Sequence, residues 1–142
     1  MEIVKATLED VDYIVERLIA TYAHINETVG MQLFHAKQPL LIRHVQKRLQ
    51  DEHSNFDYFV ARDASGNCGV VHTLREDMHG QILILDGNNK TTVQKLLAHA
   101  LQFFKEHDIN TVQTEQTPAS LAHQVLQAAG FACYMEQMQL AL

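Results

Sequence analysis

The sequence predicts a single α/β domain, residues 1–142, whose sheet is mixed but mainly antiparallel. Three apolar segments separated by turn-forming residues, Phe56–Arg62, Cys68–Leu74 and Ile82–Leu85, indicate an antiparallel meander. A long amphipathic pattern then precedes another short strand at Ile109–Thr114. A strand that returns to the sheet through a helix implies a right-handed parallel crossover, so the last strand lies parallel to its neighbour.

The first third of the chain predicts one strand and two helices. Glu2–Ala6 has strand composition, and Thr7 to Asp10 approximates a capping box for a helix whose apolar residues recur from Val11 to Tyr22. A second helix is expected from Pro39 to Asp51, because proline is favoured in a first helical turn. Between them, His24–Gln38 predicts no definite element.

The stretch around which the chain is organised runs from Gln81 to His107. Four apolar residues, Ile82–Leu85, stop at Asp86-Gly87, and a small polar run leads into apolar residues at helical spacing from Val93 to Phe104. The loop therefore joins the C-terminal end of a strand to the N-terminal end of a helix, where free amides and the positive end of the helix dipole meet. Such a place suits a phosphate or another anion.

The C-terminal part predicts a further helix and a last strand. Pro118 is expected to begin the helix, the apolar residues from Leu121 to Ala129 form its inner face, and Gly130 ends it. Alternating apolar residues from Met135 to Leu142 indicate a terminal strand.

Composition excludes several function classes. The net charge of −6 argues against nucleic acid or an anionic membrane as the partner. No apolar run of about 18 residues exists, and charges between Glu2 and Asp12 interrupt any signal peptide, so we expect a cytoplasmic protein. Cys68 and Cys133 fit buried small side chains better than a disulfide, and the nine histidines show no metal-binding spacing.

The order of elements resembles that of the GNAT superfamily of acyl-CoA-dependent N-acetyltransferases over essentially the whole chain. Ile3–Asp12 is similar to the family's first strand and helix start, Val93–His107 with Ile109–Thr114 to its central helix and fifth strand, and Ala128–Phe131 to the Gly-Phe that ends its last helix. The resemblance implies a GNAT-like mixed, mainly antiparallel central sheet of six or seven strands flanked by four helices. It also implies acetyl-CoA as co-substrate and a primary amine, on a small molecule or peptide, as acceptor by direct attack.

The acetyl-CoA loop departs from the family pattern. The motif Q/R-x-x-G-x-G/A falls on Asn88, Thr91 and Val93, so both glycines are absent, and the β-branched Val93 is expected to crowd a pyrophosphate. The loop still offers amides, hydroxyls and one ammonium, although an ordinary polar loop capping a helix explains it as well. The cofactor-binding residues that the resemblance implies are Leu83, Leu85, Asn88, Asn89, Lys90, Thr91, Thr92 and Val93.

The acid and base of the family are also not obvious here. The family's frequent tyrosine falls on Leu126 and its frequent asparagine on Ala119; leucine cannot donate a proton, and Tyr134 is either a substitute acid or a packing residue. Glu115 at the end of the fifth strand is our candidate catalytic base, with Asp86 as the next. Each has a plain alternative, a solvated strand-end charge and a turn residue respectively.

Two function classes therefore remain from the sequence. The first is an N-acetyltransferase; the second is a catalytically weak or inactive GNAT-fold domain that binds a protein or metabolite between its first two helices and the sheet. The acceptor stays unspecified, because His24–Pro39, which would shape its pocket, predicts no definite element. The exposed sheet edge leaves both a monomer and a homodimer open.

Overall fold

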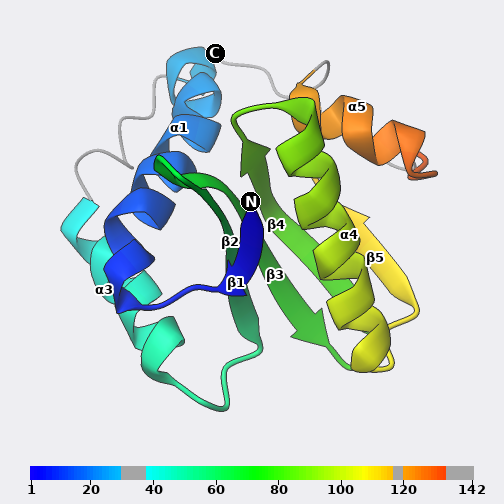
Figure 1. Cartoon of the computed structure of the whole chain (residues 1–142), viewed down its shortest axis with the longest axis horizontal. Coiled ribbons are helices and arrows are strands. Elements are labelled where there is room, and N and C mark those ends of the chain that lie inside the picture. The colour runs from blue at the N-terminus through cyan, green and yellow to red at the C-terminus, as the bar shows by residue number, and fades with distance from the viewer. Residues whose placement is uncertain (30–37, 117–119, 134–142) are drawn as a thin grey trace.

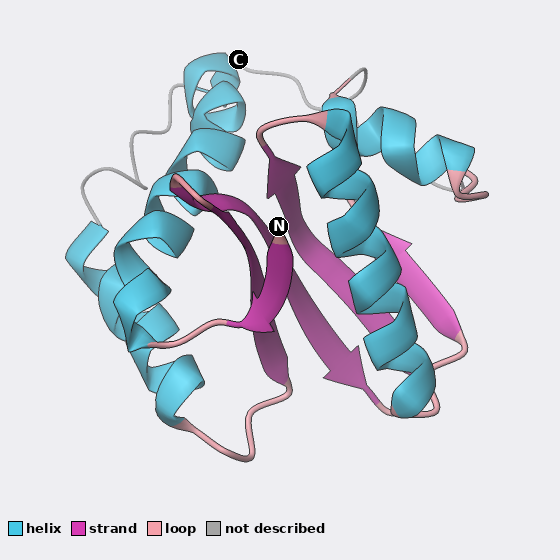
Figure 2. Cartoon of the chain, in the orientation of Figure 1, coloured by secondary structure: helices cyan, strands magenta, loops and turns pink. Residues whose placement is uncertain are grey.

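The protein forms one sheet with helices on both faces, as the computed structural model shows for residues 1–29, 38–116 and 120–133, with side chains described outside 22–38 (Figures 1 and 2). The strands are β1 (Glu2–Lys5), β2 (Phe56–Asp63), β3 (Gly66–Glu76), β4 (His79–Gly87) and β5 (Thr111–Thr114). The helices are the 3-10 turn η1 (Leu8–Asp10), α1 (Val11–Val29), α3 (Gln38–Gln50), α4 (Lys90–Glu106) and α5 (Leu121–Ala128).

The strand order confirms the predicted meander and crossover. The sheet runs β1-β2-β3-β4-β5, with every neighbouring pair antiparallel except β4 and β5, which are parallel. The described part of the chain has five strands rather than the six or seven expected. The additional strand was expected at Met135–Leu142, which lies outside the described residues. The described residues form four α-helices, the number expected.

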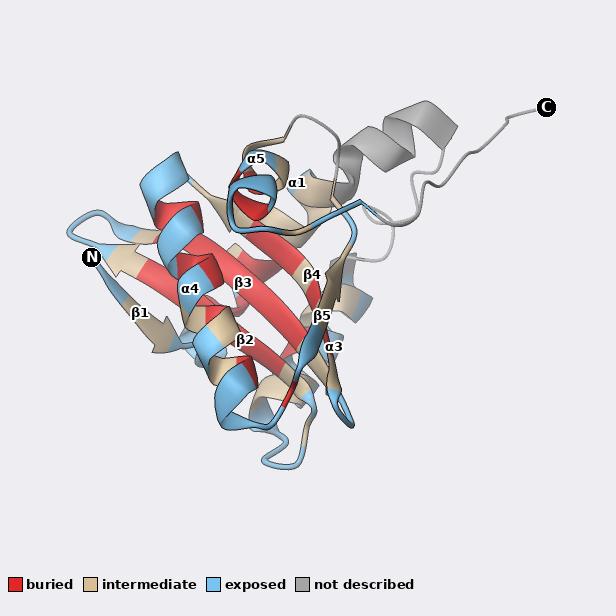
Figure 3. Ribbon diagram, turned by 90° about the vertical axis from the view of Figure 1, so that its right-hand side faces the viewer, coloured by how far each residue is buried: buried red, intermediate tan, exposed pale blue. Residues whose placement is uncertain are grey.

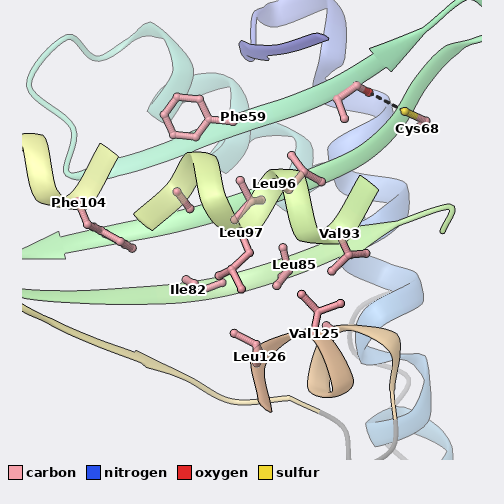
Figure 4. Close-up of a cluster of buried hydrophobic side chains, with 14 of the residues drawn as sticks. Phe59, Cys68, Ile82, Leu85, Val93, Leu96, Leu97, Phe104, Val125 and Leu126 are labelled. Carbon is pink, nitrogen blue, oxygen red and sulfur yellow. Dashed lines mark hydrogen bonds between the residues drawn. The ribbon is translucent and has the colours of Figure 1, made fainter. Parts of the chain in front are cut away.

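Each face of the sheet has its own apolar core. On one face α1 and α3 cover a cluster that includes Val15, Val45, Val60, Val70 and Ile84. On the other face α4 and α5 cover a larger cluster, shown in Figure 4, that includes Phe59, Ile82, Leu85, Val93, Leu96, Leu97, Phe104, Val125 and Leu126. Burial is concentrated in the middle of β2, β3 and β4 and on the inner side of α4 (Figure 3). The apolar spacing in the sequence thus predicted the inner faces of α1 and α4.

A β-bulge interrupts the pairing of β4 with β3. Thr73 of β3 pairs with Ile82, and His72 pairs with Ile84, so Leu83 is an extra residue in β4. Leu85 joins the core beneath α4, whereas Ile84 joins the core beneath α1. Asp86, near the end of the strand, reaches Arg17 on α1.

Glycines bring the start of α4 close to the sheet. A Cβ on Gly69 of β3 would lie 2.7 Å from Leu96 Cδ1, and one on Gly87 of β4 would lie 3.0 Å from Thr92 Cγ2. Both distances are shorter than ordinary van der Waals contact, so α4 packs closely against β3 and β4 because these positions lack side chains.

A buried carboxylate ties the first helix to the β2–β3 hairpin. Asp10 accepts hydrogen bonds from the Thr7 amide at 2.8 Å, Arg62 Nη2 at 2.8 and 2.9 Å, and Asn67 Nδ2 at 3.0 Å. Burial alone would raise the pKa of Asp10, but these hydrogen bonds and the Arg62 charge lower it below its usual value. The pairing of Thr7 with Asp10 is the one that the sequence predicted.

The ends of the last helix follow local chemistry. Ser120 caps α5 by accepting a hydrogen bond from the His123 amide, so α5 begins at Leu121, three residues after the predicted start at Pro118. Pro118 itself lies outside the described residues. Gly130 follows the helix with φ of +97°, which confirms the predicted glycine stop.

Candidate functional site

The pairing of β4 with β5 ends half-way along β4. They pair from His79 with Thr111 to Ile82 with Thr114, where Thr114 Oγ1 donates to the Ile82 carbonyl at 2.9 Å. β4 continues to Gly87, while β5 stops and the two diverge toward their C-terminal ends (Figure 1). Within the described chain, this last stretch of β4 has no strand beside it on the β5 side. Its backbone groups on that side can bind an extended ligand.

Free amides lie just beyond that edge, at the start of α4. The Asn88 amide donates to the Cys68 carbonyl, the Thr92 amide to Asn89 Oδ1 and the Val93 amide to the Asn89 carbonyl. The amides of Asn89, Lys90 and Thr91 have no acceptor among the residues that the structure describes. The sequence predicted free amides at the start of this helix, and the structure shows that they are the amides of these three residues.

The side chains of this loop divide between surface and core. Asn88, Asn89, Lys90 and Thr91 are exposed, Leu83 is half-buried, and Leu85 and Thr92 are buried, with Thr92 Oγ1 donating to Met1 Sδ. Val93 is 1% exposed and packs in the core shown in Figure 4. The crowding expected from Val93 is therefore wrong: its side chain points away from the exposed amides, and Thr91 is the side chain that shares their surface.

The two candidate bases lie on different strands. Glu115 is exposed, one residue beyond the end of β5. Asp86, near the end of β4, accepts a hydrogen bond from Arg17 Nε through Oδ2 at 2.5 Å and is partly exposed. The divergence of β4 from β5 thus places one carboxylate near the end of each strand.

The last helix, α5, has an apolar side chain, Leu126, at the position of the family's tyrosine. Leu126 is 3% exposed and packs in the same core as Leu85 and Val93 (Figure 4). The other two positions considered for this role, Ala119 and Tyr134, lie outside the described residues. Position 126 of α5 therefore supplies no proton donor.

Comparison with solved structures establishes the fold. No protein-family model matches the sequence, and no curated protein matches it. A GCN5-related N-acetyltransferase from Ralstonia eutropha JMP134 superposes with a TM-score of 0.74 at 15% identity, covering 99% of this chain and 97% of that one. The fold is that of the GNAT N-acetyltransferases.

Proteins with other described functions have similar structures. An aminoglycoside acetyltransferase from an uncultured soil metagenomic sample has a TM-score of 0.66 at 16% identity, with 99% and 94% of the two chains covered. A transcriptional regulator from Bacillus halodurans C-125 has a TM-score of 0.71 at 15% identity, with 99% of both chains covered. Identities this low show a common architecture only.

Two candidate site residues on α1, Tyr13 and Arg17, were not identified from the sequence. Arg17 pairs with Asp86, and Tyr13 lies one helical turn before it, half-buried. Burial, and then the negative charge of Asp86, raises the pKa of Tyr13 to about 12, so its phenol stays neutral. The available signal was a polar series at helical spacing, Tyr13, Arg17 and Thr21, beside the apolar stripe of α1.

The cysteines divide between core and surface. Burial raises the pKa of the Cys68 thiol, which donates to the Ala61 carbonyl at 3.4 Å and so is a packing group rather than a nucleophile. Cys133 is exposed, which corrects the expectation that both cysteines are buried; neither forms a disulfide.

Other kinds of site find no support in the described side chains, those of residues 1–21, 39–116 and 120–133. No three His, Cys, Asp or Glu residues there gather as metal ligands, and no helix there is apolar over enough residues to cross a bilayer. A shallow hollow of about 510 Å³ lies between α3 and the start of β2, lined by residues such as His44, Arg48, Phe56 and Arg75. It adjoins the opposite end of the sheet from the diverging strand ends.

Proposed function

We propose that the chain transfers an acetyl group from acetyl-CoA to a primary amine by direct attack. The observation that carries the proposal is the coincidence of two unpaired backbone surfaces, the end of β4 beyond Ile82 and the amides of Asn89, Lys90 and Thr91. A long ligand with an anionic diphosphate at one end and a peptide-like arm at the other matches both surfaces.

Named residues can hold such a ligand. The amides of Asn89, Lys90 and Thr91 donate to the pyrophosphate at the positive end of the α4 dipole, and the Lys90 ammonium adds charge. The backbone of Leu83 and Leu85 is the edge available to the pantetheine arm, since β5 has ended there. Acetyl-CoA supplies an acyl group already activated as a thioester.

The acceptor must present a neutral amine nitrogen. Glu115 is our proposed base, because its carboxylate follows the end of β5 beside the diverging strands, and Asp86 is the alternative. The nitrogen gains a bond to the acetyl carbon, the carbon–sulfur bond breaks, and one proton passes from nitrogen to sulfur overall. Leucine at position 126 gives no acid assistance from that position, where a proton donor would contribute about 10²- to 10⁴-fold, so turnover should be slow.

A binding or regulatory domain with the GNAT fold is the second candidate. The burial of Leu126 favours it, because α5 then gives no help to a departing thiolate at that position. The similarity to a transcriptional regulator of the same architecture is consistent with it. Under either function we expect a single cytoplasmic domain over residues 1–142, with monomer and homodimer both open. The partner of the transferase is a small-molecule or peptide amine, whereas the partner of the binding domain is a protein or a small metabolite.

A pair of substitutions at Lys90 tests the proposed cofactor site. Lys90 is the first residue of α4, where proline is favoured, and the preceding Asn89 has the extended backbone that proline requires, with φ of −153° and ψ of 169°. Lys90→Pro thus removes one amide hydrogen without breaking the helix. Lys90→Ala removes the same ammonium but keeps the amide.

Binding of CoA to these variants is measured by calorimetry and thermal shift. At about 100 times its dissociation constant, CoA should stabilise the natural chain by about 2.7 kcal/mol, or roughly 5 to 10 °C in Tm. Lys90→Pro should bind about 10- to 100-fold more weakly than Lys90→Ala, since a hydrogen bond to a charged group contributes about 1.5 to 3 kcal/mol. Equal affinities would remove the Lys90 amide from the site.

The same assays separate the two candidate functions. CoA binding with release of thiol from acetyl-CoA in the presence of amines supports the transferase. CoA binding without transfer to any amine leaves the regulatory domain, and absence of CoA binding removes the transferase.

A further inference from the structure

The ion pair of Arg17 with Asp86 joins the middle of α1 to the end of β4. Its side chains are 33% and 26% exposed, so the pair is open to solvent although each partner is fixed by the other. Asp86 lies two residues before Asn88, where the loop with the free amides begins. The pair therefore borders the proposed acetyl-CoA site, on the face of the sheet opposite α4.

Arg17 differs from the other ion-paired arginines of the described chain. Arg62 uses Nη2 for Asp10, and Arg75 uses Nη2 for the Ser54 carbonyl, so each has a terminal nitrogen committed to the fold. Arg17 donates only through Nε, to Asp86 Oδ2. No described residue accepts from its Nη1 or Nη2, and these two nitrogens form a fork that matches a carboxylate.

Asp86 likewise has one carboxylate oxygen with a described hydrogen-bond donor and one without. Its Oδ2 accepts from Arg17, while no donor to Oδ1 is seen among the side chains of residues 1–21, 39–116 and 120–133 or the described backbone. One ion pair therefore offers a ligand both the two terminal nitrogens of Arg17 as donors and Asp86 Oδ1 as an acceptor. Tyr13, one turn earlier on α1, adds a neutral phenol beside them.

We propose that the acceptor is a free α-amino acid, with its carboxylate on Nη1 and Nη2 of Arg17 and its amine beside Asp86 Oδ1. The two charges of the ligand must be close together because the two complementary groups belong to one ion pair, and an α-amino acid carries its charges on adjacent groups. A peptide N-terminus lacks the nearby carboxylate. This inference rests on the proposed acetyl transfer and names its substrate class.

The reaction that follows is balanced as written. The amino nitrogen forms a bond to the acetyl carbon, the thioester carbon–sulfur bond breaks, and the proton lost by nitrogen replaces the acetyl group on sulfur. The products are an N-acetyl amino acid and CoA.

Matched acceptors test the role of the carboxylate. The twenty L-amino acids and the carboxamide of each are supplied with acetyl-CoA, and thiol release is followed. At least one amino acid should exceed its own carboxamide in kcat/KM by about tenfold or more, the usual scale for a charge-assisted pair. Carboxamides that react as well as their parent acids would overturn the inference.

Variants then locate the effect on Arg17. Arg17→Gln should abolish the preference for the acid over its carboxamide, measured as the ratio of the two kcat/KM values, and Arg17→Lys, which keeps the charge but not the fork, should retain only part of that preference. Arg43→Gln removes an exposed cation from α3 and should change neither acceptor. A loss in Arg17→Gln that is equal for both acceptors would assign Arg17 a merely structural role.

Direct binding distinguishes failure of this inference from failure of the proposed function. If no transfer occurs, the same amino acids and carboxamides are titrated into the natural chain and Arg17→Gln, with binding followed by NMR. Binding of an amino acid that is lost in its carboxamide and in Arg17→Gln supports the inference even where CoA does not bind. If CoA binds normally but none of the twenty amino acids binds, the inference about the acceptor is overturned while the proposed function is not.

Discussion

His72 should make the stability of the protein depend on pH in a way that one substitution removes. Its ring stacks on Tyr58 with centroids 3.9 Å apart, is 3% exposed, and has no described partner for Nε2. Burial, and then the positive charge of Arg48, lowers the pKa of His72 from 6.5 to about 3. Phenylalanine fills a similar ring-shaped space but cannot titrate, so we choose His72→Phe.

The magnitude follows from proton linkage. The folded-state pKa lies below that of the unfolded chain, so the unfolded state binds more protons below pH 6.5 and stability falls as the pH falls. Near pH 5 the loss is RT ln(1 + 10^1.5), about 2 kcal/mol, and it levels off only as the pH approaches 3. Near pH 8 the variant should be as stable as the natural chain or more so, because the buried and unpaired His72 Nε2 is removed.

Urea unfolding near pH 8 and near pH 5 measures this difference. The natural chain should lose about 2 kcal/mol more than His72→Phe between the two conditions, which corresponds to about 1 M in the urea midpoint. His53→Gln, at an exposed histidine, serves as the control and should keep the full dependence. The same loss in His72→Phe as in the natural chain would show that this ring accepts a proton in the folded state.

Three further predictions concern packing, charge and the loop. Gly69→Ala should cost about 1 to 3 kcal/mol in urea unfolding, because its methyl group would meet Leu96. Asp10→Asn should cost about 1 to 3 kcal/mol near neutral pH, and the gap should narrow only as the pH falls below 3.8, since the pKa of Asp10 is lowered. Thr91→Gly should tighten CoA binding by calorimetry, whereas Val93→Gly should only destabilise the fold, by about 3 kcal/mol, because that side chain is core.

Sequence reasoning was reliable where local patterns and connection rules decide the structure. Apolar periodicity placed the inner face of α4, and the strand–helix–strand order gave the parallel pairing of β4 with β5. Glycine chemistry at Gly130 gave the end of α5. The loop before α4 was also located correctly, because a helix start always leaves its first amides free.

The site details depended on tertiary contacts that no local pattern shows. Arg17 and Asp86 are separated by 69 positions, and their pairing needs the packing of α1 on β4. Val93 was assigned both to the apolar series of the helix and, through the glycine motif, to the cofactor loop, and the packing of α4 shows that its side chain belongs to the core. His72 lies within a strand, where the sequence alone does not decide whether its ring is packed or exposed, and only the neighbouring strand, through Tyr58, shows that it is packed.

Leu83 is an extra residue in β4, so the side chains on either side of it do not follow the alternation of a regular strand. In a regular strand, Ile82 and Ile84 would face the same way, yet one lies beneath α4 and the other beneath α1. Deleting Leu83 would make Ile82 and Ile84 consecutive residues, and regular alternation would keep Ile82 beneath α4 and Ile84 beneath α1. Asp86 would keep its direction toward Arg17. Removal of Leu83 therefore regularises the pairing of β4 with β3 without turning any side chain to the opposite core.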